Sequence, residues 1–376
     1  MPKKHRVDFR KNRAERTRTT DWTQQFAEHA FAEETDRSEE RIGRDELSRK
    51  RTVVGEVVEN ADFEVLPAVD PTATLSGRVI TVHGASSIVE SEDGRRFRCT
   101  TRRILKTLST DQRQPVVAGD RVRFRPANTS ELLEGMIERV EPRHGTLSRE
   151  SKHRKHILVT NVDQLLIVVS AAEPDFKPNL IDRMLVTAEQ TEICPIICIN
   201  KVDLVDLAEL QPIIGAYAQM GCKVLSLSVR SGLGIERLRL QLKDRESVVL
   251  GQSGVGKSSL LNAVEPSLKL RIGEISHALK GKHTTTTAEL LKLSFGGYVV
   301  DTPGMRQFMH WDLIPEEVFG FFRDLRPYEN RCRFPNCTHS HEEDCAVKNG
   351  VAEGRLDLRR YESYLAIRDG AQRPET

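Results

Sequence analysis

The sequence lacks the features that mark membrane and secreted proteins. Its 376 residues contain no apolar run of about 18 residues, the minimum for a helix that spans a bilayer. The first twenty residues are rich in Lys and Arg and have no apolar stretch like that of a signal peptide. The seven cysteines are an odd number, which argues against a disulfide framework and favours thiols or a metal site. We therefore expect a cytoplasmic protein that makes no contact with membranes.

The sequence also has almost no net charge, which excludes a uniformly basic nucleic-acid coat protein. Fifty-seven Lys and Arg face 55 Asp and Glu, a formal charge of +2. Residues 1–20, however, hold eight basic and two acidic side chains, and residues 21–50 are mostly acidic with few apolar positions. This composition predicts a largely disordered extension over residues 1–70. The extension is either a solvated arm or one that lies along a polyanion.

Residues 71–150 have the pattern of a small β-barrel. Short β-rich runs are separated by turn signals such as Asp93-Gly94, and about five strands of this length are typical of an OB-type barrel. Strand alternation places Arg121, Arg123 and Arg125 on one face. That face suits contacts with RNA phosphates, although an ordinary solvated strand face is the alternative.

The strongest motif is a phosphate-binding loop over residues 251–258, G-Q-S-G-V-G-K-S. It follows an apolar run that predicts a buried strand and precedes a predicted helix, the context that this motif requires. Glycines let the backbone curl around phosphates, Lys257 would reach the β and γ phosphates, and Ser258 would bind Mg²⁺. The candidate phosphate-binding residues are Gly251, Gln252, Ser253, Gly254, Val255, Gly256, Lys257, Ser258 and Ser259.

A second motif indicates which nucleotide base the site would bind. The apolar run 196–199 ends in Asn200, Lys201, Val202 and Asp203, which resembles the N-K-x-D element of GTPases. There the aspartate accepts two hydrogen bonds from guanine that adenine cannot supply, which disfavours an ATP-dependent kinase. Ser228 begins a looser match to the last base-binding loop of GTPases.

Two further elements match the nucleotide-sensing loops of GTPases. Asp301-Thr-Pro-Gly304 resembles D-x-x-G, in which the aspartate holds Mg²⁺ through water and the glycine N–H senses the γ-phosphate. The threonine run between this element and the phosphate loop contains Thr285 and Thr286, candidates for the Mg²⁺-binding switch threonine. A plain solvated loop is the alternative for the threonine run.

The order of these motifs differs from that of ordinary GTPases, in which N-K-x-D follows D-x-x-G. Here N-K-V-D comes first, so one parallel sheet can hold all the motifs only if the domain, predicted over residues 151–312, is circularly permuted. The chain therefore resembles the circularly permuted small-ribosomal-subunit biogenesis GTPases of the RsgA (YjeQ) type, over about residues 74–370. The resemblance implies a monomeric GTP hydrolase that uses Mg²⁺ and binds the small subunit and its rRNA.

The residue that orients the attacking water in Ras-like enzymes is missing. A glutamine follows D-x-x-G there, whereas Met305 stands here. The resemblance implies that a histidine in the switch loop serves hydrolysis, which points to His283 as a catalytic residue beside Lys257. The alternatives are that a partner orients the water and that His283 only contacts phosphate or RNA.

A cysteine cluster predicts a zinc site within a helical C-terminal domain, residues 313–376. Three thiolates and one imidazole make a closed tetrahedral site, which is structural because no position is left for water. Spacing alone leaves His339 and His341 open, and the resemblance selects His339. The candidate ligands are Cys332, Cys337, His339 and Cys345.

The remaining patterns concern the end of the chain and the other cysteines. Leu358, Tyr361 and Leu365 recur at helical spacing and predict a helix that ends near Arg368. We expect the other four cysteines, Cys99, Cys194, Cys198 and Cys222, to lie in the core.

The sequence as a whole predicts a multidomain protein: an OB-type barrel, an α/β permuted P-loop GTPase domain and a zinc-bound helical tail. The predicted function is GTP hydrolysis that assists late maturation of the small subunit, is stimulated by that subunit and drives release. The alternative is a GTP-sensing, RNA-binding translation regulator in which hydrolysis is incidental.

Overall fold

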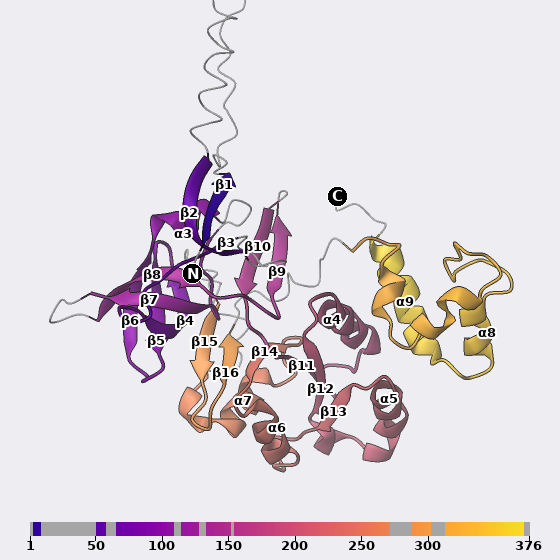
Figure 1. Ribbon diagram of the computed structural model, residues 1–376. Helices are drawn as coiled ribbons and strands as arrows, with labels where there is room; N and C mark the ends of the chain where they lie inside the picture. The colour runs from indigo at the N-terminus through magenta and orange to yellow at the C-terminus, as the bar shows by residue number, and fades with distance from the viewer. Residues whose placement is uncertain are drawn as a thin grey trace, which may run out of the picture.

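The computed structural model consists of a barrel, a six-stranded sheet with helices on both faces, and a small C-terminal helical body (Figure 1). In the parts described, no helix is long and apolar enough to cross a bilayer. The structure describes residues 3–8, 50–57, 65–108, 114–127, 133–151, 154–270, 288–301 and 313–371.

The barrel has the strand order of an OB-fold. It closes in the order β4-β5-β6-β8-β7, with β7 paired back to β4 and a single parallel pair, β6 with β8. Alternating side chains form the barrel core: Phe97 and Cys99 of β6 and Val122 and Phe124 of β7 are buried, whereas the arginines between them are not. The OB-type prediction is confirmed. The elements are β4 (Leu75–His83), β5 (Ser86–Ser91), β6 (Arg96–Thr101), α3 (Arg103–Leu108), β7 (Arg121–Pro126) and β8 (Glu134–Val140).

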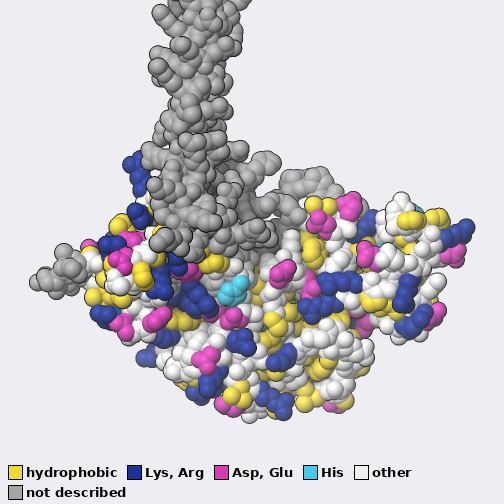
Figure 2. All heavy atoms as spheres, in the orientation of Figure 1, with side chains coloured by type: hydrophobic (Ala, Val, Ile, Leu, Met, Phe, Trp, Pro, Cys, Tyr) yellow, Lys and Arg dark blue, Asp and Glu magenta, His cyan; other side chains and the backbone are white. Residues whose placement is uncertain are grey.

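The arginines of β7 are less available for contacts with RNA phosphates than the sequence suggested. Arg121, Arg123 and Arg125 share one face, but each lies within 4.0 Å of a carboxylate: Glu246, Glu141 and Glu138 respectively. The face of the molecule in Figure 2 likewise mixes acidic with basic side chains over the barrel. A phosphate contact at these positions would have to compete with an existing ion pair.

Three strands precede the barrel, where the sequence predicted a largely disordered extension. The sheet β1-β2-β3 is antiparallel and consists of β1 (Lys3–Asp8), β2 (Lys50–Val57) and β3 (Val65–Pro67). Its centre is the β-branched run Thr52-Val53-Val54, a strand signal that the charge argument overlooked. Residues 1–2, 9–49 and 58–64 of the predicted extension lie outside the described residues.

The central sheet has the order β13-β12-β11-β14-β16-β15, with every pair parallel except β15–β16. Strand β11 is buried along its whole length because helices cover both faces: α4 and α5 on one, α6 and α7 on the other. The strands are β11 (Gln164–Ser170), β12 (Cys194–Asn200), β13 (Lys223–Ser226), β14 (Glu246–Leu250), β15 (Glu289–Lys292) and β16 (Tyr298–Asp301). The helices are α4 (Pro178–Gln190), α5 (Leu207–Gln219), α6 (Ile235–Leu242) and α7 (Lys257–Val264), with 3₁₀ turns η1 (Val202–Leu204) and η2 (Pro266–Leu268).

The sheet order supports circular permutation. The guanine-type motif follows β12 and the phosphate loop follows β14, yet the strand between them in space, β11, comes before both in the chain. The early half (β11, β12, β13) and the late half (β14, β15, β16) meet at the β11–β14 pair. A hairpin, β9 (Leu147–Ser151) with β10 (Arg154–Val159), connects the barrel to this sheet.

The C-terminal body packs on α4 through its last helix (Figure 1). The predicted helix is present and ends at Ala371. Tyr361 and Leu365 pack against the apolar cluster of this body, whereas Leu358 is 54% exposed; Ser363, Tyr364 and Ile367 are buried. The elements are η5 (Val318–Phe321), η6 (Arg326–Arg331), α8 (Ala346–Ala352) and α9 (Leu358–Ala371).

A buried ionic cluster attaches α9 to α4. Arg360, only 5% exposed, donates to Asp182 of α4 at 2.6 Å and to Asp324 at 2.8 and 3.0 Å. The Tyr217 hydroxyl also donates to Asp182 at 3.0 Å, and the guanidinium lies 4.5 Å above the Phe322 ring. Because Asp182 is fully buried, its charge depends on these donors.

We predict that Arg360→Met lowers the free energy of unfolding by about 3–5 kcal/mol, because it leaves a buried carboxylate without its cation. The matched control is Arg359→Met, whose guanidinium is 45% exposed and pairs with Asp357, a contact worth about 0–1 kcal/mol. Thermal unfolding of the two variants measures the difference. Equal losses in both would contradict the assignment.

Candidate nucleotide site and metal centre

The candidate nucleotide site lies at the carboxyl edge of the parallel sheet, where ligands bind in open α/β folds. The loops that follow β11, β12, β13 and β14 and the end of β16 all reach this edge. They carry most of the nucleotide-binding residues that the sequence predicted. The arrangement brings motifs that are 50 residues apart in the chain into one site.

The phosphate loop has the backbone conformation that its glycines permit. Gly254 and Gly256 have φ of +84° and +94°, and α7 begins at Lys257, with Ser258 buried in its first turn. The Lys257 ammonium donates to the carbonyls of Gly251 and Gln252 at 2.8 and 2.7 Å. The lysine therefore lies over the loop that would hold phosphates.

Asn200 joins the guanine-type loop to the phosphate loop. Its side-chain amide donates to the Val255 carbonyl at 2.8 Å, and it is 2% exposed. A Cβ added at Gly256 would lie 2.4 Å from the same amide nitrogen, so only glycine fits there. Within the described parts, Asn200 Oδ1 is a buried acceptor without a hydrogen-bond partner. The two motifs thus form one unit with an unsatisfied polar atom.

The residues of the two predicted base-binding loops, after β12 and β13, also contact one another. The Ser228 hydroxyl donates to Asp203 at 2.6 Å and accepts from the Ser231 N–H at 3.1 Å, which fixes one carboxylate oxygen. The Val202 N–H donates to the Leu227 carbonyl, which ties the two loops together. Lys201 has φ of +59°, and its ammonium donates to the Glu173 carbonyl. The looser match at Ser228 therefore lies beside the aspartate that it would assist.

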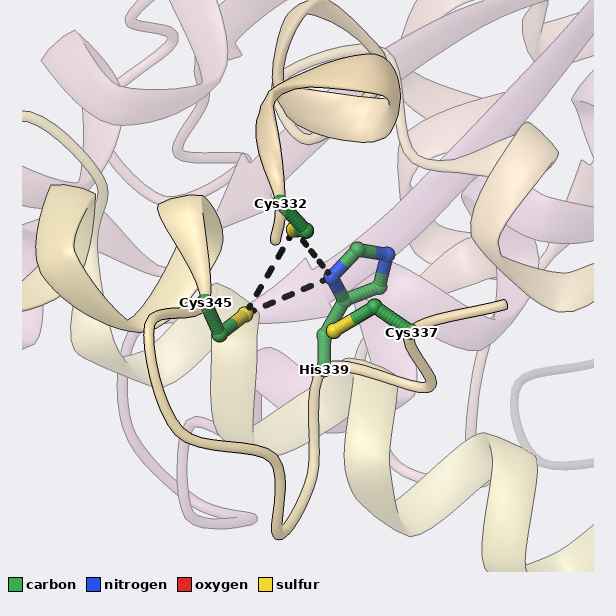
Figure 3. A group of neighbouring side chains, drawn as sticks. All are labelled: Cys332, Cys337, His339 and Cys345. Atoms are coloured by element: carbon green, nitrogen blue, oxygen red, sulfur yellow. Dashed lines mark hydrogen bonds between the residues drawn. The ribbon is translucent and has the colours of Figure 1, made fainter. Parts of the chain in front are cut away.

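The predicted metal ligands form a compact cluster in the C-terminal body (Figure 3). The four donor atoms of Cys332, Cys337, His339 and Cys345 lie within 4.8 Å of one another. His339 Nδ1 is 3.4 Å from the sulfurs of Cys332 and Cys345, and those sulfurs are 3.9 Å apart. His341 is 82% exposed and lies outside the cluster.

These distances fit a tetrahedral zinc ion. Zn–S bonds of about 2.3 Å and Zn–N bonds of about 2.0 Å place tetrahedral donors roughly 3.5–3.8 Å apart, close to the three spacings among Cys332, His339 and Cys345. Burial lowers the pKa of His339, which keeps the imidazole in its neutral, ligating form. Burial also raises the pKa of the Cys337 thiol to about 12, so a cation is needed for thiolates to form there.

Aromatic side chains hold the metal-binding loop in place. Phe319 stacks on the His339 ring with centroids 4.2 Å apart, and the hydroxyl of Tyr361 donates to the His339 carbonyl at 2.7 Å. Tyr364 donates to the Thr338 carbonyl at 2.8 Å. The cluster is thereby connected to α9 and to the packed interior of the C-terminal body.

Comparison with known proteins identifies the family. The family model described as RsgA GTPase matches residues 140–311. A Small ribosomal subunit biogenesis GTPase RsgA from Chlorobaculum parvum is 40% identical over 306 residues, which cover 79% of this chain and 98% of that protein. The chain belongs to the RsgA family of GTPases. A protein of the same name from Shewanella oneidensis is also 40% identical, over 78% of this chain and 82% of its own length.

Solved structures agree with the RsgA assignment. The crystal structure of YjeQ from Thermotoga maritima has a TM-score of 0.67 and 36% identity, covering 80% of this chain and all of that one. YloQ, described as a circularly permuted GTPase, has a TM-score of 0.63 and 29% identity, covering 82% of this chain and all of its own. The permuted fold inferred from motif order is thus shared with RsgA-family structures.

Several predicted residues of this RsgA chain cannot be placed. His283, Thr285, Thr286 and Gly304 lie outside the described residues, and only the backbone of Asp301 is described, at the end of β16. Cys194 is exposed, so the prediction that it lies in the core is wrong; Cys99, Cys198 and Cys222 are buried as predicted.

Sequence reasoning missed the loop between β11 and α4. Besides the Glu173 carbonyl that binds Lys201, this loop carries Pro174, whose Cδ lies 3.8 Å from the position of a Cβ at Gly254. The loop therefore borders both the base side and the phosphate side of the site. One signal was available, because residues 171–177 follow the apolar run 165–169, which indicates a buried strand, and so had to reach the carboxyl edge.

We predict that Gly256→Ala weakens GDP binding by at least about tenfold. The new methyl group would meet Asn200 Nδ2 and separate the two motifs, in addition to a left-handed backbone strain of about 1–2 kcal/mol. Gly354→Ala is the matched control, because φ there is +71° and nothing lies within 4 Å of the added Cβ. Titration with a fluorescent GDP analogue compares them. Similar affinities in both variants would show that the Asn200 contact is dispensable.

Proposed function

We propose that this chain is a GTP hydrolase that binds the small ribosomal subunit and its rRNA and assists the late maturation of that subunit. The observation that carries the proposal is the hydrogen bond from Asn200 to Val255, which unites a guanine-type loop with a phosphate loop. The relatives that are 40% identical are named for small-subunit biogenesis. In this proposal the subunit stimulates hydrolysis, and hydrolysis drives release.

The phosphate loop would bind the β and γ phosphates of GTP. The first amides of α7 have no partner within the helix and are available to phosphate oxygens, together with the N–H groups of residues 251–258. Lys257 would exchange its two loop carbonyls for phosphate oxygens and offset part of their charge. Charge developing on the phosphates during hydrolysis is thereby stabilised by groups already in place.

Ser258 and Asp301 are the proposed holders of a Mg²⁺ ion. Strands β14 and β16 are paired in parallel, with Val248 opposite Val300, so the residues that follow them emerge at the same sheet edge. A hydroxyl and a carboxylate are oxygen donors of the kind that Mg²⁺ prefers. When bound, this ion neutralises phosphate charge.

Guanine specificity is assigned to the loops after β12 and β13. Asp203 would accept from the guanine N1–H and exocyclic amine, and the Ser228 hydroxyl orients its carboxylate. The aliphatic part of Lys201 would cover the base, held there by the Glu173 carbonyl. Adenine lacks the two donors that Asp203 requires, which supports GTP over ATP as the substrate.

We assign the orientation of the attacking water to His283. Met305, the residue after D-T-P-G, carries a thioether that cannot orient a water. An imidazole can order or deprotonate water near neutral pH. Thr285 or Thr286 would complete the Mg²⁺ site, and the Gly304 N–H would sense the γ-phosphate. The support for these roles is motif position and the family resemblance.

Single-turnover hydrolysis tests the function. We expect slow hydrolysis by the purified protein and faster hydrolysis with small subunits, while His283→Ala retains GTP binding and loses about 10²-fold or more in rate. His83→Ala, an exposed histidine at the end of β4, is the control. Equal rates with and without subunits would favour a GTP-sensing translation regulator. Wild-type rates in His283→Ala would remove that residue from the mechanism.

We also propose that Cys332, Cys337, His339 and Cys345 bind one structural Zn²⁺. Removal of one ligand should release the metal and destabilise the small C-terminal body, because metal binding supplies part of its folding free energy. Metal analysis and thermal unfolding of Cys337→Ser should show loss of zinc and a lower Tm. Cys194→Ser, which alters an exposed thiol, should retain both. Full zinc content in Cys337→Ser would overturn the ligand assignment.

A further inference from the structure

A polar cavity lies between the barrel and the central sheet, beside their direct contacts. Its volume is about 860 Å³, and its walls come from β4, β5, β7 and β8 of the barrel and from β14, β15 and β16 of the sheet. Figure 1 shows β15 and β16 beneath the barrel, and β4 makes direct contact with β15. Charged side chains bridge the interface around the cavity, while Ile80 of β4 packs in the apolar cluster that contains Leu290 of β15 and Val300 of β16. Interfaces with a large polar part allow bodies to shift relative to one another.

Glu90 of β5 makes the central bridge. It is 5% exposed and accepts from the Lys292 ammonium at 2.5 Å and from the Tyr298 hydroxyl at 2.9 Å, both on the sheet. Burial opposes ionisation of Glu90, but the hydrogen bonds from Lys292, Tyr298 and Arg96 lower its pKa. The carboxylate is therefore charged at neutral pH. We call Glu90, Lys292 and Tyr298 the barrel latch.

A second bridge lies beside the barrel latch. Arg78 of β4 pairs with Glu246 at the start of β14, and its guanidinium lies 5.2 Å above the Tyr298 ring. The Glu246 N–H is held in turn by the Asp163 carboxylate at 2.8 Å. Burial raises the pKa of Glu246 to about 7, so its charge varies in the range of an ordinary assay. Glu90 is for that reason the better position for a test.

The barrel latch and the neighbouring Arg78–Glu246 pair contact the starts of strands whose carboxyl ends lead to nucleotide-site residues. Tyr298 is the first residue of β16 and Asp301 is the last, roughly 10 Å away along an extended strand. Strand β14, held through Glu246, leads to the phosphate loop at Gly251. Lys292 ends β15, which pairs with β16 throughout. A shift of the barrel is therefore transmitted along short, hydrogen-bonded strands.

We propose that the barrel latch positions β16, and with it Asp301, for GTP hydrolysis, so that RNA docking on the barrel changes the hydrolysis rate. This inference rests on the proposed function and adds residues outside the nucleotide motifs. Glu90, Lys292 and Tyr298 are positioning residues, because they act through β16 and contact no nucleotide group. We also expect the nucleotide state to bias the pose of the barrel, because a change at β16 reaches the barrel through the same contacts.

The test compares Glu90→Gln with Arg96→Gln in the full-length protein. Glutamine keeps the size of Glu90 and removes its charge. Arg96, which is 54% exposed, also pairs with Glu90 but belongs to the barrel itself, so its loss disturbs the carboxylate without breaking the bridge to the sheet. Lys292→Met breaks the same bridge from the sheet side, at a side chain that is 50% exposed, and serves if Glu90→Gln folds poorly.

The first readout needs no ribosome. Hydrogen exchange of residues 75–91 is measured with GDP and with a non-hydrolysable GTP analogue. We expect exchange to differ between the two nucleotides in the wild type and in Arg96→Gln, and to lose that difference in Glu90→Gln and Lys292→Met. Identical exchange with both nucleotides in the wild type, or an unchanged difference in both latch variants, would overturn the inference.

The second readout is GTP hydrolysis at saturating small subunits. We expect the maximal subunit-stimulated rate to fall at least about fivefold in the latch variants, with the half-saturating subunit concentration unchanged. A higher half-saturating concentration with normal maximal stimulation would overturn the inference, because the latch would then serve docking alone. If small subunits do not stimulate GTP hydrolysis by the wild type, the proposed function is refuted instead. The hydrogen-exchange comparison would then still show whether the barrel latch couples the barrel to the nucleotide site.

Discussion

The parallel pairing of β11 with β14 is the interaction on which the rest of the structure depends. It joins an early half that carries the guanine-type loops to a late half that carries the phosphate loop. Side chains reinforce the pairing, since the Gln164 amide donates to the Ser247 hydroxyl at 2.7 Å and to the Gln241 carbonyl at 2.9 Å. Only with these strands adjacent does Asn200 reach Val255 across the sheet edge. A nucleotide at this edge would contact both halves, so its binding free energy would add to the pairing.

Each flanking body is joined in the chain to one half of the permuted domain but packs on the other half. The barrel runs in the chain into the early half, yet its polar bridges go to β14, β15 and β16 of the late half. The C-terminal body follows the late half, yet Arg360 binds Asp182 of α4 in the early half. Each flank is thus covalently joined to one half and packed on the other. Circular permutation makes this possible, because it places the two chain ends of the domain next to different flanks.

Local patterns were sufficient for the parts of the site that are contiguous in sequence. The phosphate loop and N-K-V-D could be predicted because glycine conformation and strand-to-loop context act over a few residues. The contacts between bodies could not, since Glu90 and Lys292 are 202 positions apart and each reads as an ordinary exposed charge. The buried face of α9 was predicted only in part, through Tyr361 and Leu365, for a related reason. Arg360 is on that face, and a pattern based on apolar spacing has no place for a buried arginine whose partners lie on distant elements.

The side chains at the two interfaces, that of the C-terminal body and that of the barrel, indicate which body can move more easily relative to the central sheet. At the C-terminal interface, Val186 of α4 packs in one apolar cluster with Phe322 and Tyr364, and Arg360 is enclosed by two carboxylates. Rotation there would expose apolar surface and separate a buried charge from its partners, both costly. The barrel interface also has apolar contacts, since Ile80 belongs to the cluster of Leu290 and Val300, but it surrounds a polar cavity, and Lys292 and Arg121 are half exposed, so water can replace part of its contacts. The early half and the C-terminal body should therefore move as one unit, with the barrel as the part that responds.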